Sequence, residues 1–328
     1  MKVVIPVAGA GVDLRPHSYT QPKALIPLAG NTVLGIIIDQ LKEVGLNDFV
    51  FVIGYLGEKI ANYVQSKYPE INAHFITQEN RKGAGHAVSL AKELVGNEEI
   101  LITLGDSICE YDIEKMLKRP VSMIGVKKTD NPREFGVVET NGDVIESVIE
   151  KPQIPKSNIA MVGIYKILET PLFFECLQKN IEDGVLTQGL VTLTDAIQCM
   201  LEKGTRFEAF RVDNWFDAGN KDSILASNAI LIKKYGQKSM PGAYENSVII
   251  DPVSIGPGCI VTNSIVGPNV TLGENTRIER SIVSNSIVGA FTNLFDIVLT
   301  DSLIGGDTLL KGKKRILNVG ENTTIDLG

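Results

Sequence analysis

The sequence predicts an α/β protein in which a doubly wound mixed sheet is followed by a parallel β-helix. Over the first two-thirds of the chain, short apolar runs alternate with segments of helical periodicity, which is typical of βαβ units. Beyond a polar stretch that contains glycine and proline, helical patterns stop and aliphatic residues recur at about every sixth position. Such short repeats cannot bury their own face, so their coils must stack and share a core.

The composition is that of an ordinary soluble globular protein. The 328 residues are 44% hydrophobic and 22% charged, which suggests two domains with full cores. The net charge of −7 argues against general binding to nucleic acid or anionic membranes, since both need a basic surface. No stretch approaches the roughly 20 apolar residues of a membrane span, and the chain starts in a strand pattern without a signal peptide. The four cysteines lack CxxC spacing, so we expect a reduced, cytoplasmic protein.

The first part of the chain has a regular strand and helix rhythm. Its predicted strands span residues 2–8, 48–55, 73–78 and 99–106. Its predicted helices span residues 31–46, 58–68 and 83–95. Asn31 or Thr32 is expected to cap the first helix. Because ligands of doubly wound sheets bind beyond the carboxyl ends of the strands, we expect the functional site at the 9–23 loop and at Asp106.

The pattern becomes less regular after about residue 120. Shorter strands, partly antiparallel, are predicted at residues 121–129, 135–140, 143–152, 160–167 and 207–219, and helices at 171–180 and 193–204. We therefore place the first domain at residues 1–235, a linker at 236–246 and the β-helix at 247–328. Glycines of the β-helix are spaced 17, 16 and 16 residues apart, which predicts about four slightly trimmed coils.

Residues 7–25, VAGAGVDLRPHSYTQPKAL, contain the glycine turn after the first predicted strand. A dinucleotide-binding turn needs a third glycine where Leu14 stands, and the Gly-Lys-Ser/Thr of a P-loop is absent. Gly9 and Gly11 can still turn backbone N–H groups toward an anion, and Lys23 behind a proline adds a positive charge. The alternative is a plain turn between a strand and a helix.

Two aspartates stand at the ends of predicted strands beside a glycine, Asp106 in LGDS and Asp217 in NWFDAGN. One or two carboxylates together with phosphate oxygens are the usual ligands of Mg²⁺ in proteins, so these residues predict a magnesium site. The alternative is that each carboxylate only caps a turn. The neighbours Glu150 and Lys151 in IEKP are, by themselves, typical of a solvated surface pair.

Together and in this order, these segments resemble the sugar-1-phosphate nucleotidylyltransferases. The opening signature of that family reads roughly GxGTRLxPxTxxxPK, and it is matched by Gly9, Gly11, Leu14, Pro16, Pro22 and Lys23. Later segments also resemble family motifs, namely TQENRKGAGHAV, LGDS, FGVVE, EKP, VGIY and NWFDAGN. The resemblance spans nearly the whole chain and is greatest to the long form of glucose-1-phosphate thymidylyltransferase, which implies a left-handed β-helix.

The resemblance also implies roles for particular residues. It places the nucleotide at Ala8, Gly9, Gly11, Gln78 and Gly83. It places the sugar phosphate at Gly136, Glu150, Lys151 and Tyr165. It assigns catalysis to Lys23 and Asp106, with Arg15 as a further candidate, and a bound Mg²⁺ to Asp106 and Asp217.

The implied reaction converts a nucleoside triphosphate and a sugar 1-phosphate into a nucleoside diphosphate sugar and pyrophosphate. Gln78 can pair with the imide edge of uracil or thymine, so dTTP or UTP with glucose 1-phosphate is favoured, and mannose 1-phosphate with GTP is the alternative. We expect no nucleic-acid or membrane partner and a homo-oligomer. Acyl transfer by the β-helix is disfavoured, since it commonly uses a histidine base and all three histidines precede residue 245.

The loop departs from the family signature at Val12 and Asp13, where the family has Thr-Arg. Loss of one such cation typically costs about 10²–10³ in rate, and a carboxylate adds repulsion. Three alternatives stay open: Arg15 takes the role, Asp13 binds a metal that restores the charge, or the chain binds nucleotide or nucleotide sugar without turnover. A smaller departure is Leu190 in place of a glutamate, and we interpret the nearby Thr194 as a helix cap.

Overall fold

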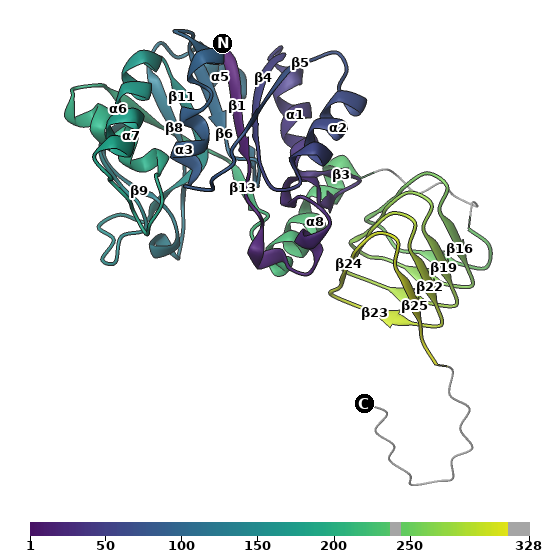
Figure 1. Cartoon of the computed structure of the whole chain (residues 1–328). Coiled ribbons are helices and arrows are strands. Elements are labelled where there is room, and N and C mark those ends of the chain that lie inside the picture. Colours follow the sequence, from purple (N-terminus) through teal and green to yellow (C-terminus); the bar gives the residue numbers. More distant parts are fainter. Residues whose placement is uncertain (237–243, 314–328) are drawn as a thin grey trace. The chain divides into compact units, whose positions relative to one another are not determined.

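The computed structural model describes residues 1–236 and 244–313, which form two compact units (Figure 1). The first unit comprises Met1–Ile26 and Asn31–Ser227, and the second comprises Pro27–Gly30 and the chain from Asn228 onward. Residues 237–243 of the predicted linker and 314–328 of the predicted β-helix domain lie outside the described residues. Within the described residues, no helix has the length and apolar character needed to cross a membrane.

A nine-stranded mixed sheet forms the centre of the first unit. In spatial order its strands are β5 (Asn72–Thr77), β4 (Asp48–Ile53), β1 (Lys2–Val7), β6 (Ile100–Thr103), β11 (Ile159–Ile167), β8 (Ser122–Lys128), β12 (Phe207–Arg211), β10 (Val144–Ile149) and β9 (Val137–Asn141). The strands β5, β4, β1 and β6 run parallel, whereas β11 is antiparallel to both β6 and β8. The mixed sheet predicted from the sequence is therefore confirmed.

Helices cover both faces of this sheet. The helices of the first unit are α1 (Val33–Glu43), α2 (Gly57–Lys67), α3 (Ala84–Ser89), α4 (Lys92–Val95), α5 (Ile113–Lys118), α6 (Thr170–Glu182) and α7 (Leu193–Glu202). A further helix, α8 (Lys221–Tyr235), begins in the first unit and ends in the second. Val3 and Val4 of β1 are both fully buried although they point to opposite faces. On one face, α3, α6 and α7 contribute Ala87, Phe173 and Ile197 to the same core cluster as Val4 (Figure 1).

Short elements surround the carboxyl edge of the sheet. The loop after β1 contains three short 3₁₀ helices, Val12–Leu14, His17–Tyr19 and Lys23–Leu25, and a fourth spans Pro132–Glu134. The strands β2 (Pro27–Leu28) and β3 (Asn31–Thr32) then lead into α1. The Thr32 hydroxyl accepts a hydrogen bond of 2.9 Å from the Gly35 amide, so Thr32 is one of the two caps predicted for this helix.

The predicted strand at 207–219 is wrong in one respect, because the chain forms two strands there. β12 continues the central sheet beside β8, whereas β13 (Asn214–Asp217) pairs with β7 (Ser107–Glu110) in a separate two-stranded sheet. The chain passes from one sheet to the other between Val212 and Asp213. The Val212 amide donates to Val126 O of β8 at 3.0 Å, and the Asp213 amide donates to Glu110 O of β7 at 2.8 Å. This change of partner brings the end of β13 to the end of β6.

The predicted helix at 83–95 is also divided, into α3 and α4. The amides of Leu90 and Ala91 bond to carbonyls only three residues back, at 3.2 and 3.0 Å, which is the tighter pattern of a 3₁₀ turn. The elements β7, α5 and α8 are not among the elements predicted from the sequence.

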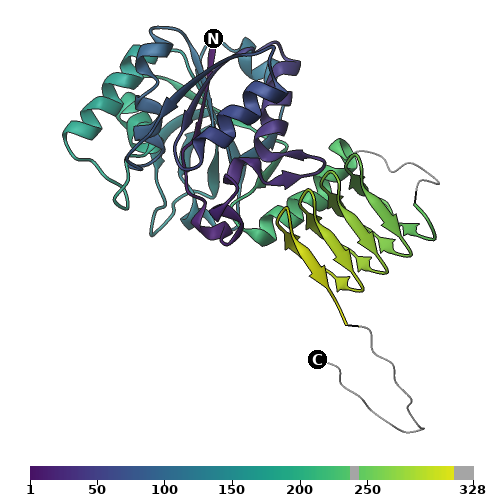
Figure 2. The same ribbon diagram turned by 45° about the vertical axis from the view of Figure 1, so that its right-hand side comes forward.

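Three parallel four-stranded sheets form the second unit, consistent with the predicted parallel β-helix (Figure 2). The first contains β14 (Val248–Ile249), β17 (Ile265–Val266), β20 (Ile282–Val283) and β23 (Val298–Leu299). The second contains β15 (Val253–Ile255), β18 (Val270–Leu272), β21 (Ile287–Val288) and β24 (Leu303–Ile304). The third contains β16 (Ile260–Thr262), β19 (Arg277–Glu279), β22 (Asn293–Phe295) and β25 (Leu309–Lys311). The chain visits the three sheets in turn, which gives the four predicted coils.

Stacking of the coils explains both their aliphatic residues and their glycines. Val266, Ile278 and Val283 are fully buried between the sheets. A Cβ atom on Gly289 would lie 2.4 Å from the backbone nitrogen of Gly306 in the next coil, so no side chain fits at this corner. The left hand of the coil stays a prediction from the family resemblance.

Asn228 connects three segments inside the second unit. Its side-chain oxygen accepts hydrogen bonds from the Ala29 amide at 2.9 Å and the Thr271 hydroxyl at 2.7 Å. Its amide group donates to Asn269 O at 3.3 Å. Since the residue is 1% exposed, water cannot replace these partners, and each bond is costly to lose.

We predict that Asn228→Ala lowers the free energy of unfolding by about 1–3 kcal/mol, because it leaves buried polar groups unpaired. Chemical denaturation monitored by circular dichroism measures this change. The matched control is Asn97→Ala at an exposed position, which should stay within about 0.5 kcal/mol of the wild-type protein. An Asn228→Ala variant as stable as this control would contradict the assigned role.

Candidate active site

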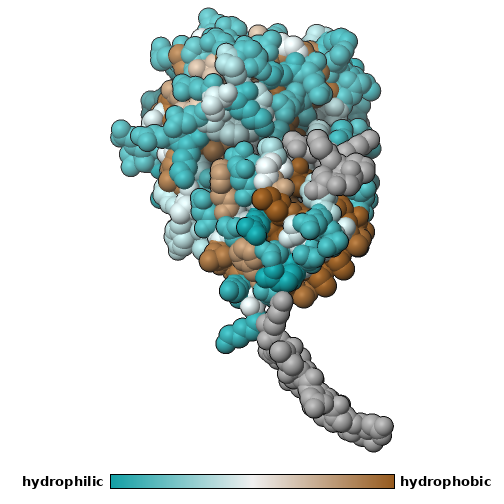
Figure 3. All heavy atoms as spheres, turned by 90° about the vertical axis from the view of Figure 1, so that its right-hand side faces the viewer, coloured by the Kyte–Doolittle hydropathy of each residue, from teal (hydrophilic) through white to brown (hydrophobic). Residues whose placement is uncertain are grey.

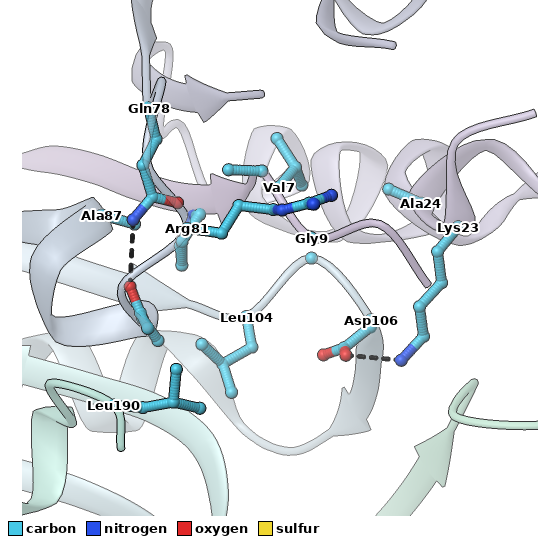
Figure 4. A pocket seen from close by; sticks show the side chains of 15 residues that line it. Val7, Gly9, Lys23, Ala24, Gln78, Arg81, Ala87, Leu104, Asp106 and Leu190 are labelled. Carbon is cyan, nitrogen blue, oxygen red and sulfur yellow. Dashed lines mark hydrogen bonds and ion pairs between the residues drawn. The ribbon is translucent and has the colours of Figure 1, made fainter. Parts of the chain in front are cut away.

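A cavity of about 330 Å³ opens at the carboxyl ends of β1 and β6 (Figure 4). Its lining residues are Pro6, Val7, Ala8, Gly9, Lys23, Ala24, Gln78, Arg81, Gly83, Ala84, Ala87, Leu104, Gly105, Asp106 and Leu190. Six of the residues predicted from the sequence are therefore brought together here, namely Ala8, Gly9, Lys23, Gln78, Gly83 and Asp106. The cavity lies where parallel α/β sheets usually bind their ligands.

The glycine turn after β1 forms one wall. A Cβ atom on Gly9 would meet nothing within 4 Å, so the backbone here is open to a ligand. Gly11 does not line the cavity, but it adopts a left-handed φ of 59° and would place a Cβ atom 3.0 Å from Lys23 Cβ. Gly11 thus allows the loop to turn closely past Lys23, which positions that lysine at the cavity.

Lys23 forms an ion pair with Asp106, with 2.7 Å between Nζ and Oδ2 (Figure 4). Asp217 lies in the same electrostatic environment, because β13 pairs with β7 and the Ala218 amide donates to Asp106 O at 3.0 Å. Burial raises the pKa of the Asp217 carboxyl, the Lys23 cation lowers it, and the Asp106 carboxylate raises it again. Two carboxylates from distant segments therefore lie close to one cation.

These two carboxylates suit a hard divalent cation. Mg²⁺ is usually held by one or two protein carboxylates, and its other positions are filled by phosphate oxygens and water. Within the described residues, no group of three or more histidine, cysteine, aspartate or glutamate side chains could hold a metal ion by itself. Asp106 and Asp217 thus fit an ion that arrives with a phosphate ligand.

Gln78 is 5% exposed and has a fixed orientation at the opposite wall from Lys23 (Figure 4). Its amide nitrogen donates to Gly83 O at 3.2 Å and lies 2.8 Å from His86 Nδ1. Burial, with help from the Lys82 cation, lowers the pKa of His86 and keeps the ring neutral near pH 7. In the tautomer with its proton on Nε2, His86 Nδ1 accepts from Gln78, whose amide oxygen is then available to a ligand.

Gly83 adopts a φ of 103°, a conformation that side chains rarely tolerate. A Cβ atom here would lie 2.4 Å from Val191 O, so the backbone of residues 82–85 packs directly against the segment before α7. The Val191 amide donates to Lys82 O at 2.8 Å, and the Gly85 amide donates to Val191 O at 3.0 Å. These bonds hold the Gln78 segment against the cavity.

A second cluster contains three of the residues predicted to bind the sugar phosphate. The Thr194 hydroxyl donates a hydrogen bond to Glu150 Oε2. A Cβ atom on Gly136 would lie 2.9 Å from that oxygen and 2.3 Å from Met161 Cε, so a side chain at this position would crowd the carboxylate. Burial raises the pKa of Tyr165, and the Glu150 charge raises it further, which places the phenol near this carboxylate. Lys151 is exposed and takes a left-handed φ of 42°.

The interpretation of Thr194 as a helix cap is wrong. The N-cap of α7 is Thr192, whose hydroxyl accepts from the Asp195 amide at 3.0 Å. Thr194 lies two residues further, inside the first turn of α7, and its hydroxyl donates to Glu150. From the sequence, either threonine could be the N-cap of this helix. The structure shows that α7 begins at Leu193, which makes Thr192 the cap.

Two charged residues of the glycine loop lie outside the cavity. Asp13 is exposed in the first 3₁₀ helix, and Arg15 places its guanidinium 5.0 Å from the centre of the Tyr19 ring. The predicted role of Arg15 in catalysis stays a prediction. Arg81 and Leu190 do line the cavity, although sequence reasoning did not assign them to the site. The position of Arg81 in the TQENRKGAGHAV segment, between Gln78 and Gly83, was the available signal.

Comparison with known proteins supports a common origin over most of the chain. Residues 2–234 match the family model described as Nucleotidyl transferase. Low-salt glycan biosynthesis nucleotidyltransferase Agl11 of Haloferax volcanii is 31% identical to this chain, and the match covers 100% of both proteins. Glucose-1-phosphate thymidylyltransferase of Streptomyces griseus is 29% identical over 95% of this chain and 88% of that protein.

The fold is shared with solved structures. A crystal structure of UDP-glucose pyrophosphorylase complexed with UDP-glucose superimposes with a TM-score of 0.62 and 23% identity, covering 71% of this chain and 99% of that chain. A putative glucose-1-phosphate thymidylyltransferase from Bacillus anthracis gives the same TM-score with 24% identity over 73% of this chain and 98% of that chain. The match to the family model, residues 2–234, includes every residue that lines the cavity.

We predict that Lys23→Met raises the pKa of the Asp217 carboxyl further, because it removes the cation that lowers this pKa. A carbon-13 NMR titration of the aspartate carboxyls measures the shift, with Asp217→Asn to identify the resonance. Lys23→Arg keeps the charge and should preserve the wild-type titration. If the Asp217 pKa stays constant or falls in Lys23→Met, the described coupling of the three groups is incorrect.

Proposed function

Since the chain belongs to the sugar-1-phosphate nucleotidyltransferase family, we propose that it makes a nucleoside diphosphate sugar and pyrophosphate from dTTP or UTP and glucose 1-phosphate. The observation that carries this proposal is the grouping of Lys23, Asp106 and Asp217 beside a cavity whose other wall holds the oriented amide of Gln78. One end suits phosphates and a divalent cation, and the other presents the Gln78 amide oxygen, which can accept a hydrogen bond from a donor group of the base.

The chemistry needs positioning and charge neutralisation more than proton transfer. An oxygen of the sugar phosphate attacks the α-phosphorus of the nucleoside triphosphate, and the bond from that phosphorus to the bridging β-phosphate oxygen breaks. Pyrophosphate leaves, and no covalent enzyme intermediate is needed. The open backbone at Gly9 and the Lys23 ammonium bind the transferring and leaving phosphates. Lys151 is our candidate for holding the attacking phosphate.

Asp106 and Asp217 are the residues that would hold Mg²⁺, which would offset phosphate charge when bound. The Lys23 ammonium forms an ion pair with Asp106, and its charge opposes the rise in the Asp217 pKa that burial causes. When phosphates enter, the same ammonium can donate to their oxygens instead. The structure supports this assignment through its donor set, two carboxylates and one lysine at the edge of the sheet.

Recognition of the sugar is assigned to the second cluster. Glu150 can accept hydrogen bonds from sugar hydroxyls while Thr194 holds one of its oxygens. Gly136 leaves space beside that carboxylate, and the Tyr165 phenol stays protonated as a donor because its pKa is raised. This arrangement suits a neutral polyhydroxyl ligand such as glucose, with mannose as the alternative to be tested.

The predicted homo-oligomer is proposed to form through the second unit. Val248, Ile265, Ile282 and Val298 stack in register along one sheet and are 37–71% exposed. Figure 3 shows hydrophobic residues gathered on this unit. An exposed apolar column of this kind is typical of a protein interface.

The proposed reaction is tested by measuring pyrophosphate release with dTTP, UTP or GTP, Mg²⁺, and glucose or mannose 1-phosphate. We expect turnover with dTTP or UTP and glucose 1-phosphate. Asp217→Asn should lower kcat/KM by about 10²–10³, as expected when a key stabilising group is removed. The control Asp222→Asn, at an exposed position in the first turn of α8, should retain wild-type turnover.

The opposing outcome is tight nucleotide binding without any pyrophosphate release. That result would contradict the enzyme assignment and favour a nucleotide-binding regulatory protein. In that case, the combined change Val12→Thr with Asp13→Arg tests whether the loop alone is responsible, since it restores the signature of the family.

We also predict that the KM for the nucleotide rises as the pH falls from 7 toward 5. The lowered pKa of His86 keeps the ring neutral at pH 7, and protonation at lower pH removes the acceptor that orients Gln78. Steady-state kinetics across this range measures the effect. In Gln78→Ala the KM should be high and should lose this pH dependence. An unchanged pH profile in that variant would show that another group is responsible.

A further inference from the structure

The cavity contains two cationic side chains among its lining residues, Lys23 and Arg81. Lys23 is already engaged, because its ammonium lies 2.7 Å from Asp106. Arg81 is exposed and forms no hydrogen bond or ion pair with any other residue in the described ranges. Figure 4 shows its side chain extending from the Gln78 wall across the cavity in the direction of Lys23. The guanidinium is therefore available to a ligand.

Apart from Lys23, the glycine loop supplies no cation to this space. Asp13 is exposed and does not line the cavity, and Arg15 is stacked on Tyr19 at 5.0 Å. The open backbone at Gly9 can offer amide groups to phosphate oxygens, but amides leave the net phosphate charge uncompensated. A second cationic side chain besides Lys23 would offset more of the charge of a bound triphosphate.

The backbone on both sides of Arg81 is held in place. The backbone amide of Gln78 donates to Ile53 O at 2.7 Å, which attaches the segment to β4. Four residues after Gln78, the chain is held again, because Lys82 O accepts a hydrogen bond from the Val191 backbone amide at 2.8 Å. Gly83 packs directly against Val191. Because both flanks are fixed, the Arg81 side chain starts from a defined position at the cavity rim.

We propose that Arg81 binds the triphosphate and supplies the positive charge that the glycine loop lacks. The inference rests on the proposed function, since it takes a nucleoside triphosphate as the ligand of this cavity. A guanidinium matches phosphate oxygens with two parallel N–H donors and stays charged at every relevant pH. Lys23 then approaches the phosphates from the Asp106 side, while Arg81 approaches them from the Gln78 side.

The competing role for Arg81 is contact with the base or ribose, because it shares a segment with Gln78. The two roles differ in which ligand is affected. A base or ribose contact weakens dTTP and dTMP binding equally, whereas a contact to the outer phosphates weakens dTTP much more than dTMP.

The test is calorimetric binding of dTTP and dTMP to wild-type protein and to Arg81→Gln. We expect a loss of about 10–100-fold in dTTP affinity, which corresponds to one charge-assisted hydrogen-bonding group, and less than about threefold for dTMP. The matched control is Lys92→Gln, which also removes one positive charge and whose side chain is exposed and does not line the cavity. It should bind both ligands like the wild type. Arg81→Lys should recover part of the dTTP affinity, since it retains the charge without the planar fork.

Thermal unfolding of every variant shows whether the fold is retained. Equal losses for dTTP and dTMP, or a dTTP affinity within twofold of wild type in Arg81→Gln, would overturn the inference.

The binding readout separates this inference from the proposed function. If wild-type protein releases no pyrophosphate but Arg81→Gln still loses dTTP selectively, the proposed function fails and the role of Arg81 stands. If turnover is normal and Arg81→Gln binds and reacts like wild type, the role of Arg81 fails and the proposed function stands. If dTTP, UTP and GTP all fail to bind the wild-type protein, both are overturned.

Discussion

The ion pair between Lys23 and Asp106 is the interaction on which the site depends. It joins the loop after β1 to the turn after β6. The charges of both residues also act on the carboxyl of Asp217 at the end of β13. Asp106 and Asp217 repel each other, and burial further disfavours the charge on Asp217. The Lys23 cation opposes both effects, because it pairs with Asp106 and lowers the pKa of Asp217.

The remaining walls of the site are fixed by backbone geometry. Gly11 and Gly83 both take left-handed φ values and bring neighbouring segments closer than a side chain would allow. Gly11 brings the loop to Lys23, and Gly83 brings the Gln78 segment to Val191. These segments around the cavity can approach each other closely because glycine has no side chain.

Charge within the site is distributed differently from the pattern that the loop sequence suggests. Asp13 points to solvent, where water and salt screen its repulsion of an anion. The Arg15 guanidinium lies over the Tyr19 ring. Arg81, from the segment after β5, places a positive charge at the cavity. A substitution in one loop therefore need not abolish phosphate binding when a different element faces the same space. The presence of Asp13 alone is a weak argument against activity.

The sequence by itself determined the features that depend on local patterns. Apolar runs and helical periodicity predict the alternating strands and helices, the strand ends predict Gly9 and Asp106 at the cavity, and the glycine spacing predicts the coils. Only the tertiary structure decided that β13 leaves the central sheet to bring Asp217 to Asp106, that Thr194 binds Glu150, and that Arg81 faces Lys23 across the cavity. These contacts join residues distant in the chain, and they depend on strand pairing and side-chain direction, which periodicity along the chain does not encode.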